Sequence, residues 1–295
     1  MIRKRLRLKS WASMAVIGVL FSLCSCNVLE HLSTQSEVMS VAEEIRLGDK
    51  LAARLDGAHQ RHDDPLVQAY ADALGQRLLE RVGPEKDAFD FEFIVIDDPA
   101  AISAFALPGG RVYISSGLIM MSESEAELAC IIGHEIAHII KRHIPLRIAT
   151  RRSVSEGLTT PADSVANSDG SHEVFMTNNS IGRSYLLSFT RKQEGAADAV
   201  GLTYAINAGY NPYWFIDFFE RIEEMGRSQS QVKTVHPDHF ERVHNIRRYI
   251  ESLSLTPDHN GGETFEQVHA VLWGPNGRPA LFWRAERGPG PPAGR

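Results

Sequence analysis

The sequence predicts an α+β domain that is mostly helical and contains a small sheet. Three observations support this prediction. Several segments repeat apolar residues at helical spacing, two short segments have the pattern of strands, and a long apolar helix contains His-Glu-Ile-Ala-His at residues 134–138. The chain has 295 residues, of which 43% are hydrophobic, and this is enough for one sizeable domain.

The N-terminal residues have the composition of a bacterial export signal. A basic stretch precedes Trp11 to Leu23, an uncharged and mostly apolar run that is shorter than the ~20 residues of a transmembrane helix. The run leads into Leu23-Cys24-Ser25-Cys26, which resembles a lipobox with Cys26 at the acylated position. We therefore expect residues 1–25 to be a lipoprotein signal peptide, Cys26 to be lipidated, and residues 26–40 to form a tether. The alternative is a plain secretory signal or an uncleaved anchor.

These features indicate a protein of the bacterial cell envelope that faces the periplasm and is held at a membrane by its lipid anchor. Asn27, after the cysteine, favours the outer membrane over the inner one. The signal holds five positive charges and no negative ones, so its removal changes the net charge from −6 to −11. An acidic body of this kind argues against nucleic acid as a partner.

The first structural elements of the body are expected to be two helices and two strands. Helical spacing predicts helices at Val41 to Leu55 and at Pro65 to Val82, the second beginning where proline follows Asp64. Residues 89–96 alternate and then become continuously apolar, which is typical of a strand entering a core. A second strand is predicted at residues 111–115, after a Pro-Gly-Gly turn.

The next predicted helix contains the HEIAH segment. The pattern Ser122-Glu-Ser-Glu125 resembles a capping box and precedes a run with apolar periodicity. We expect the helix to extend from about Glu123 to His143, where Pro145 would stop it. The HEIAH segment would then lie inside a rigid element.

The remaining chain is expected to hold two amphipathic helices, at Trp214 to Met225 and at Phe240 to Leu253, which would end the domain spanning residues 41–255. Between the halves of the domain, residues 152–183 are polar and are interpreted either as a lid or as a flexible insertion. Residues 256–295 are expected to form a C-terminal extension, with a hairpin at 270–284 that turns around residues 274–277 and a disordered end at 287–295.

The HEIAH segment and a second acidic motif supply the residue types of a metal-dependent hydrolase. His134 and His138 are four residues apart and therefore share one helix face, with Glu135 on its flank. Downstream, Glu194 and Asp198 also share a face, and the small residues between them allow close helix packing. We expect Glu194 to be the third metal ligand and Asp198 to accept a hydrogen bond from a ligating imidazole.

Two imidazoles and one carboxylate with an open fourth position form the ligand set of a catalytic Zn²⁺. Such an ion lowers the pKa of its water from 15.7 to about 7, and a neighbouring carboxylate takes the proton. The prediction is one Zn²⁺ per chain and a zinc metalloendopeptidase, with Glu135 as the general base.

Four segments extend this interpretation to a family. These segments resemble the signature blocks of metallopeptidase family forty-eight and follow the family's order. They are FALPGGRVYISSGLI, HEIAHIIKRH, TRKQEGAADAVGLTYAINAGYNP and HPDHFERV. That group includes HtpX, the CAAX prenyl protease, the mitochondrial Oma enzyme, BepA and LoiP. The resemblance implies a zincin-like fold with an HExxH active-site helix, zinc bound by His134, His138 and Glu194, Glu135 as base, and Asp198 behind the ligands.

The family's HP-then-Arg block matches His236, Pro237 and Arg242. The resemblance leaves three roles open for this block. Arg242 or His236 stabilises the oxyanion, or His236 occupies the open zinc position in a resting state. Capping of a helix by His236 is the alternative without a catalytic role.

The predicted substrates are unfolded or misassembled envelope proteins, and the predicted function is periplasmic protein quality control. We expect extended substrate to pair with residues 111–115 as an edge strand near the metal, because main-chain hydrogen bonds position the scissile amide and read side chains only loosely. The alternative is a largely latent, zinc-binding, chaperone-like lipoprotein that assists outer-membrane protein assembly, with the assembly machinery as its partner.

Overall fold

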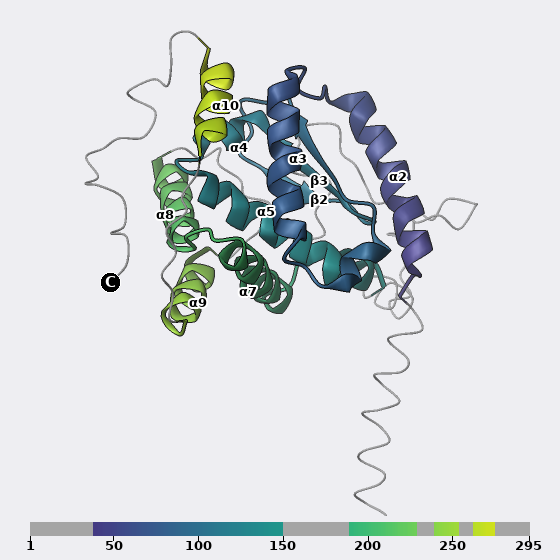
Figure 1. Ribbon diagram of the computed structural model, residues 1–295. Coiled ribbons are helices and arrows are strands. Elements are labelled where there is room, and N and C mark those ends of the chain that lie inside the picture. Colours follow the sequence, from purple (N-terminus) through teal and green to yellow (C-terminus); the bar gives the residue numbers. More distant parts are fainter. Residues whose placement is uncertain (1–37, 150–188, 229–238, 254–261, 275–295) are drawn as a thin grey trace, which may run out of the picture.

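A three-stranded mixed sheet lies between one N-terminal helix and a group of helices that contains the HEIAH segment (Figure 1). The computed structural model describes residues 38–149, 189–228, 239–253 and 262–274. The expectation of a mostly helical α+β fold with a small sheet is confirmed.

The described elements follow one another with short connections. In chain order they are α2 (Val41–Ala58), α3 (Pro65–Leu79), the 3-10 helix η1 (Pro84–Ala88), β1 (Glu92–Ile96), β2 (Ala104–Ala106), β3 (Arg111–Ser115), α4 (Ser116–Met121), α5 (Glu125–Ile140), α7 (Arg191–Asn207), α8 (Tyr213–Ser228), α9 (His239–Glu251) and α10 (Glu263–Trp273).

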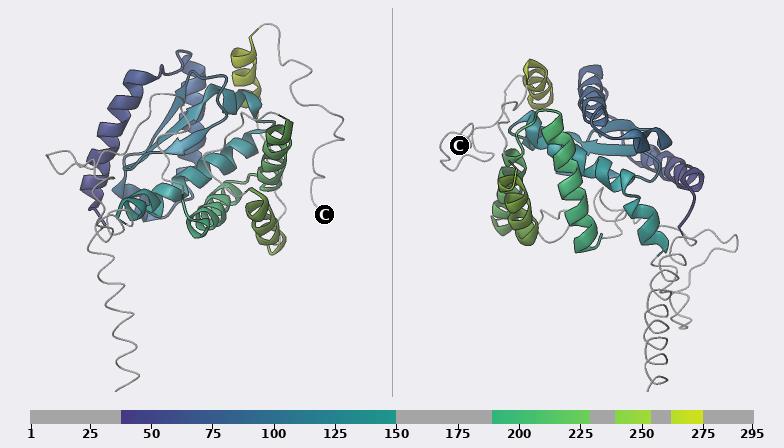
Figure 2. Two further views of the ribbon diagram at one scale, coloured as in Figure 1. Left: turned by 180° about the vertical axis from the view of Figure 1, so that it is seen from behind. Right: turned by 60° about the horizontal axis from the view of Figure 1, so that its bottom comes forward.

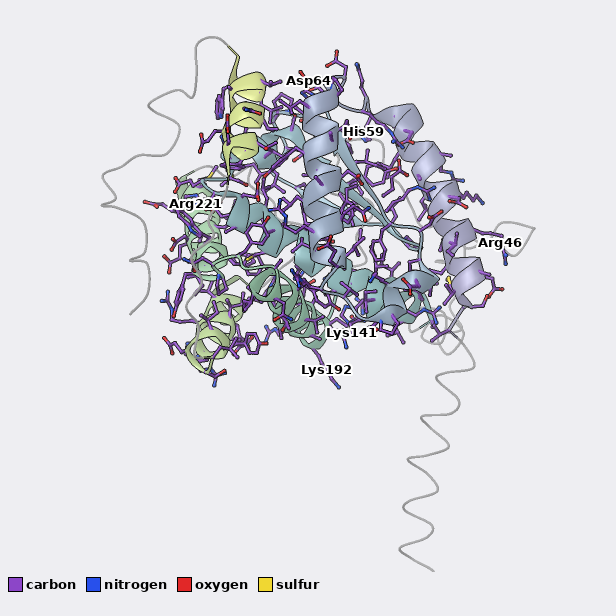
Figure 3. All side chains as sticks on the ribbon, viewed as in Figure 1. Arg46, His59, Asp64, Lys141, Lys192 and Arg221 are labelled. Carbon is purple, nitrogen blue, oxygen red and sulfur yellow. The ribbon has the colours of Figure 1, made fainter. Side chains whose placement is uncertain are left out.

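The first two helices begin as the sequence predicts. Ser40 caps α2 through a capping box with Glu43, and the Asp64 side chain accepts a hydrogen bond from the Leu66 backbone at the start of α3, where Pro65 follows the cap. Figure 3 labels Asp64 at this end of α3. Each cap satisfies a backbone donor that the helix itself leaves without a partner.

The two faces of the sheet bury different side chains against different helices. Phe93, Val95, Val112 and Ile114 belong to the larger core, which also contains residues of α3 and α5. The alternate strand positions, among them Ile94 and Tyr113, pack with Leu51, Ala52 and Leu55 of α2 in a second cluster. Successive strand residues point to opposite faces, so burial on both faces explains the nearly continuous apolar run of β1. Figure 2 shows α2 along one flank of the sheet, away from α8 and α9.

The strand at residues 111–115 is in the centre of the sheet, and the expectation that it is an edge strand was wrong. The strand order is β1-β3-β2, with β1 parallel and β2 antiparallel to β3. β2 was not predicted, because a strand of three residues is too short to show an alternating pattern. The outer side of β1 is also occupied, since His62 and the Gln68 side chain both hydrogen bond to the Val95 backbone. The outer strands are thus β1 and β2, and β2 is the one whose outer side meets the HEIAH helix, since its Ala106 N–H bonds to Glu135.

The helix with the HEIAH segment is shorter at both ends than the sequence predicts. Its cap is Ser124, which accepts from the Glu127 backbone, and not Ser122. It ends at Ile140, because Arg142 has a φ of 53° and interrupts the helical backbone. Residues 143–149 are again helical, so Pro145 lies in a first turn, where proline is tolerated, and does not act as the stop.

The C-terminal helix α10 belongs to the packed body. Phe265 and Val268 are in the larger core, and the Phe265 ring lies 6.3 Å from that of Tyr70 on α3. The helix continues to Trp273, so the expected hairpin is wrong for residues 270–273. The core therefore includes residues beyond 255, the expected end of the domain.

Several predictions concern residues outside the described part of the chain. These are the signal at 1–25, Cys26 and most of the tether, the segment 152–183, and the tail at 287–295. Within the described residues, no helix is both long enough and apolar enough to cross a membrane.

Replacement of Phe265 by alanine should lower the free energy of unfolding by about 3 kcal/mol, because it removes a buried ring from the core. Urea unfolding followed by circular dichroism measures this change. Glu266→Ala is the matched control, since Glu266 is exposed on the same helix. Equal midpoints for the two variants would contradict a stabilising role of the Phe265 ring.

Candidate metal centre

The site is built where α5 and α7 cross with their backbones in contact. Figure 1 shows α7 beside α5. Gly133 and Gly201 lie where the two backbones meet. A methyl group placed on Gly201 would be 2.5 Å from the His134 backbone nitrogen, and one on Gly133 would be 2.7 Å from the Gly201 carbonyl oxygen. Glycine inside a helix costs about 0.5–1 kcal/mol relative to alanine, and here it allows the two helices to approach.

The start of α7 sets the register of its acidic face. Thr190 accepts from the Gln193 backbone and Gln193 returns a bond to the Thr190 backbone, which completes a capping box. Glu194 then lies in the first turn, and Asp198 and Gly201 follow on the same side of the helix. The side that packs against α5 is thus the side that carries the two carboxylates.

His134, His138 and Glu194 converge at this crossing. The two imidazole Nε2 atoms are 2.9 Å apart, and the Glu194 carboxylate oxygens lie 3.5 Å from His134 Nε2 and 3.9 Å from His138 Nε2. All three side chains are buried, and their ligand atoms lie within 4.8 Å of one another. Two imidazole nitrogens and one carboxylate oxygen facing a common point fit a small divalent cation.

Asp198 and Arg242 stand behind His134. Asp198 Oδ1 is 2.9 Å from His134 Nδ1, and Arg242 binds both Asp198 oxygens, at 2.9 and 2.6 Å. Burial alone would raise the pKa of Asp198, but the Arg242 guanidinium and His134 hold it below its ordinary value. The stability that this ionised carboxylate contributes is therefore present above the unfolded-state pKa and lost only as pH falls toward the lower folded-state value.

His138 is enclosed by two aromatic side chains. Its Nδ1 lies 3.0 Å from the Nδ1 of His143, and its ring stacks on Phe189 with centroids 4.0 Å apart. Burial, with a smaller contribution from His134, lowers the pKa of His143 to about 4. The sequence predicts His143 at the end of the HEIAH helix, and its contact with His138 was not predicted. The signal in the sequence that could have indicated this contact is a histidine five residues after His138.

Glu135 links α5, the helix with the HEIAH segment, to the sheet. Its Oε2 accepts a hydrogen bond of 2.9 Å from the Ala106 N–H on β2. Residues 103, 105 and 107 pair with β3, so the N–H and C=O groups of Ala104 and Ala106 point away from β3. The carboxylate of the HExxH segment is thus placed at the edge of the sheet.

Two ion-pair networks fix the first turn of α5. Arg221 of α8, labelled in Figure 3, binds both carboxylate oxygens of Glu127, which is fully buried. Arg77 and the Tyr210 hydroxyl both bond to Glu125. Carboxylates at a helix N-terminus also interact favourably with its dipole. These contacts hold the helix that presents both histidines.

The structure brings together six of the predicted site residues, which are His134, Glu135, His138, Glu194, Asp198 and Arg242. Arg242 is buried against Asp198 and lies 3.2 Å from Glu194, beside the candidate metal position, and its role at an oxyanion stays a prediction. His236 lies outside the described residues. The sequence interpretation also missed the glycine pair. Of the small residues 195–197 that were expected to allow close packing, Ala197 is buried in the core, whereas Gly195 has open space around it.

An HExxH helix crossed by a second helix with a glutamate, beside a small mixed sheet, is the architecture of a zincin-like metallopeptidase domain. The model of the family described as "Peptidase family M48" matches residues 65–250. The chain belongs to this family, whose peptidases are metal-dependent, and the resemblance inferred from the sequence is confirmed.

Named relatives agree with the family. The chain is 29% identical over 238 residues to the "Beta-barrel assembly-enhancing protease" of Escherichia coli K12, covering 78% of this chain and 48% of the relative. It is 28% identical over 264 residues to the "Putative beta-barrel assembly-enhancing protease" of Vibrio cholerae, covering 84% and 53%. It is 33% identical over 185 residues to "Mitochondrial metalloendopeptidase OMA1" of Schizosaccharomyces pombe, covering 61% and 53%. The chain spans about half the length of these curated relatives.

Gly201→Ala should destabilise the protein by about 1–3 kcal/mol and weaken metal binding, because the added methyl group forces α7 away from His134. Thermal unfolding and competition of zinc with a chelator measure the two effects. Gly195→Ala on the same helix is the control, since nothing lies within 4 Å of its new methyl group, and it should be neutral or slightly stabilising. Equal behaviour of the two variants would contradict the role of the crossing.

Proposed function

We propose that this protein is a zinc-dependent endopeptidase with one Zn²⁺ held by His134, His138 and Glu194. The observation that supports this most directly is the convergence of the two imidazoles and the carboxylate at one buried point. The donor set of two nitrogens and one oxygen is that of catalytic zinc sites. Asp198 is proposed to fix the ring of His134 through Nδ1, and Arg242 to hold Asp198 and Glu194 in place.

The metal and Glu135 have different roles in the proposed peptide hydrolysis. Zinc, when bound, supplies Lewis acidity toward water and toward the peptide carbonyl. Glu135 is one residue after His134, and its carboxylate is held by the Ala106 N–H at the sheet edge. We propose that Glu135 takes the proton of the attacking water and passes it to the leaving amine. His236 stays a candidate for oxyanion stabilisation or for occupation of the open position.

The proposed binding surface for substrate is the outer edge of β2, in place of residues 111–115. Ala104 and Ala106 present main-chain groups on this side, beside the helix that carries Glu135. An extended peptide that pairs with this edge would run past the candidate metal centre. Such pairing needs a flexible or unfolded chain and uses backbone groups that every sequence shares.

We propose unfolded or misassembled envelope proteins as substrates and periplasmic quality control as the physiological role. The names of two relatives, which refer to β-barrel assembly, support this substrate class and suggest the outer-membrane assembly machinery as a partner. The lipobox-like segment at Cys26 supports attachment to the outer membrane by lipid.

Glu135→Gln should fold, bind zinc with nearly the affinity of the wild type, and lose cleavage of casein by about 100-fold or more, because the amide cannot accept the proton. Casein turnover, zinc content and circular dichroism are measured on wild type and variant. Treatment of the wild type with a zinc chelator should abolish turnover, and added zinc should restore it. Substantial activity in Glu135→Gln would falsify the role of this residue.

The second candidate function is a latent, chaperone-like lipoprotein that binds zinc and cleaves little. A variant in which a short Gly-Ser linker replaces residues 152–183 distinguishes the two functions. If the protein is a peptidase, we expect casein turnover in the full-length protein or in this variant. Turnover should be faster in the variant if the segment covers the site. Absence of turnover in both, together with suppressed aggregation of an unfolded outer-membrane protein, would favour the chaperone.

A further inference from the structure

His143 contacts a proposed zinc ligand from outside the HExxH segment. Its Nδ1 lies 3.0 Å from His138 Nδ1, the two rings are nearly perpendicular at 75°, and the His143 side chain is buried. His138 turns its other nitrogen, Nε2, toward His134 and Glu194. The ring of His138 is thus held on one nitrogen by His143, while the other faces the candidate metal position.

This contact depends on the break that ends α5. In a continuous α-helix, residues five apart differ in direction by about 140°, so His143 would point away from His138. Here Arg142 has a φ of 53°, and the chain turns back so that His143 begins the next helical segment beside His138. A non-glycine residue in this region of φ is uncommon and is held only by its surroundings.

The surroundings of Arg142 supply that constraint. Its Nε donates to Glu44 Oε2 at 2.8 Å, and its guanidinium also donates to the Met39 carbonyl. Glu44 is 1% exposed and belongs to the first turn of α2. The strained residue is therefore tied to the N-terminal helix, and His143 follows it directly in the chain.

We infer that His143 is a positioning residue for the metal site. Its Nδ1 accepts a hydrogen bond from His138 Nδ1 and so leaves His138 Nε2 free to bind zinc. This inference rests on the proposed zinc ligands. Of two facing Nδ1 atoms, one must donate and the other accept. A ligating Nε2 bears no hydrogen, so the hydrogen of His138 is on Nδ1 and His143 Nδ1 is the acceptor.

The two zinc-binding histidines then have partners of different charge. His134 faces Asp198, an ionised carboxylate paired with Arg242, whereas His138 faces a neutral imidazole. An anionic partner raises the basicity of a ligating imidazole more than a neutral one does. A neutral acceptor therefore fixes the orientation of His138 without adding another negative charge beside Glu194.

Three variants test this role through zinc affinity, measured by chelator competition, and through the visible spectrum of the Co²⁺-substituted protein. His143→Leu removes the acceptor and should weaken zinc binding about 10- to 100-fold and change the Co²⁺ bands. His143→Asn places an amide oxygen where Nδ1 stood and should recover most of the affinity. His244→Leu changes an exposed histidine of α9 and should have no effect. Thermal unfolding of the metal-free proteins detects any general loss of fold.

Zinc affinity and Co²⁺ bands of His143→Leu that equal those of the wild type would overturn the inference. Zinc-loaded protein that cleaves casein neither at full length nor with residues 152–183 replaced would instead overturn the proposed function, and it would leave the affinity comparison valid. A measurement on the wild type alone covers the case in which His143→Leu does not fold. Long-range ¹H–¹⁵N spectra of the zinc-loaded protein should show hydrogen on Nδ1 of His138 and none on Nδ1 of His143, and the opposite assignment would refute the role.

Discussion

The contact between Gly133 and Gly201 is the constraint on which the candidate site depends. It brings α7 against the backbone of His134, so that side chains of ordinary length span the remaining distance. Glu194 and Asp198 lie seven and three residues before Gly201, on the side of α7 that packs against α5. Packing and ligand geometry are therefore set by one helix face, and any change in helix separation changes both together.

Burial of charge is the cost of this arrangement, and paired charges offset it. Glu194 and Asp198 are both buried, and Arg242 is the cation that faces them. Removal of one partner from a buried ion pair is destabilising by about 3–5 kcal/mol, because the other charge is left without compensation. Arg242 therefore offsets the burial of both carboxylates, whether or not substrate is present. The same principle applies to Arg221, which compensates Glu127 at the start of α5.

The sequence predicts the parts of this protein that depend on local patterns. The helix of HEIAH, the strand at residues 111–115 and the cap at Asp64 follow from spacing and capping residues over a few positions. The misses depend on contacts between distant residues. A three-residue strand has no periodicity to detect, the central place of β3 depends on β2, and the break at Arg142 depends on Glu44, which lies about a hundred residues earlier. The glycine crossing was visible only as two glycines within helical runs.

If substrate pairs with β2 as proposed, the identity of the edge strand limits how substrate is selected. Had β3 been at the edge, a strand of five residues would have been available to pair with a bound peptide. The edge of β2 has only three residues, all of them in the segment Ala-Phe-Ala, and Ala104 and Ala106 are the two whose main-chain groups point outward. One of these groups, the Ala106 N–H, already bonds to Glu135. A peptide therefore gains few main-chain hydrogen bonds, each worth about 1 kcal/mol net, and this modest gain cannot repay the unfolding of a stable segment. Selection by such an edge depends on whether a chain is already extended and accessible, which is the property that distinguishes unfolded proteins from folded ones.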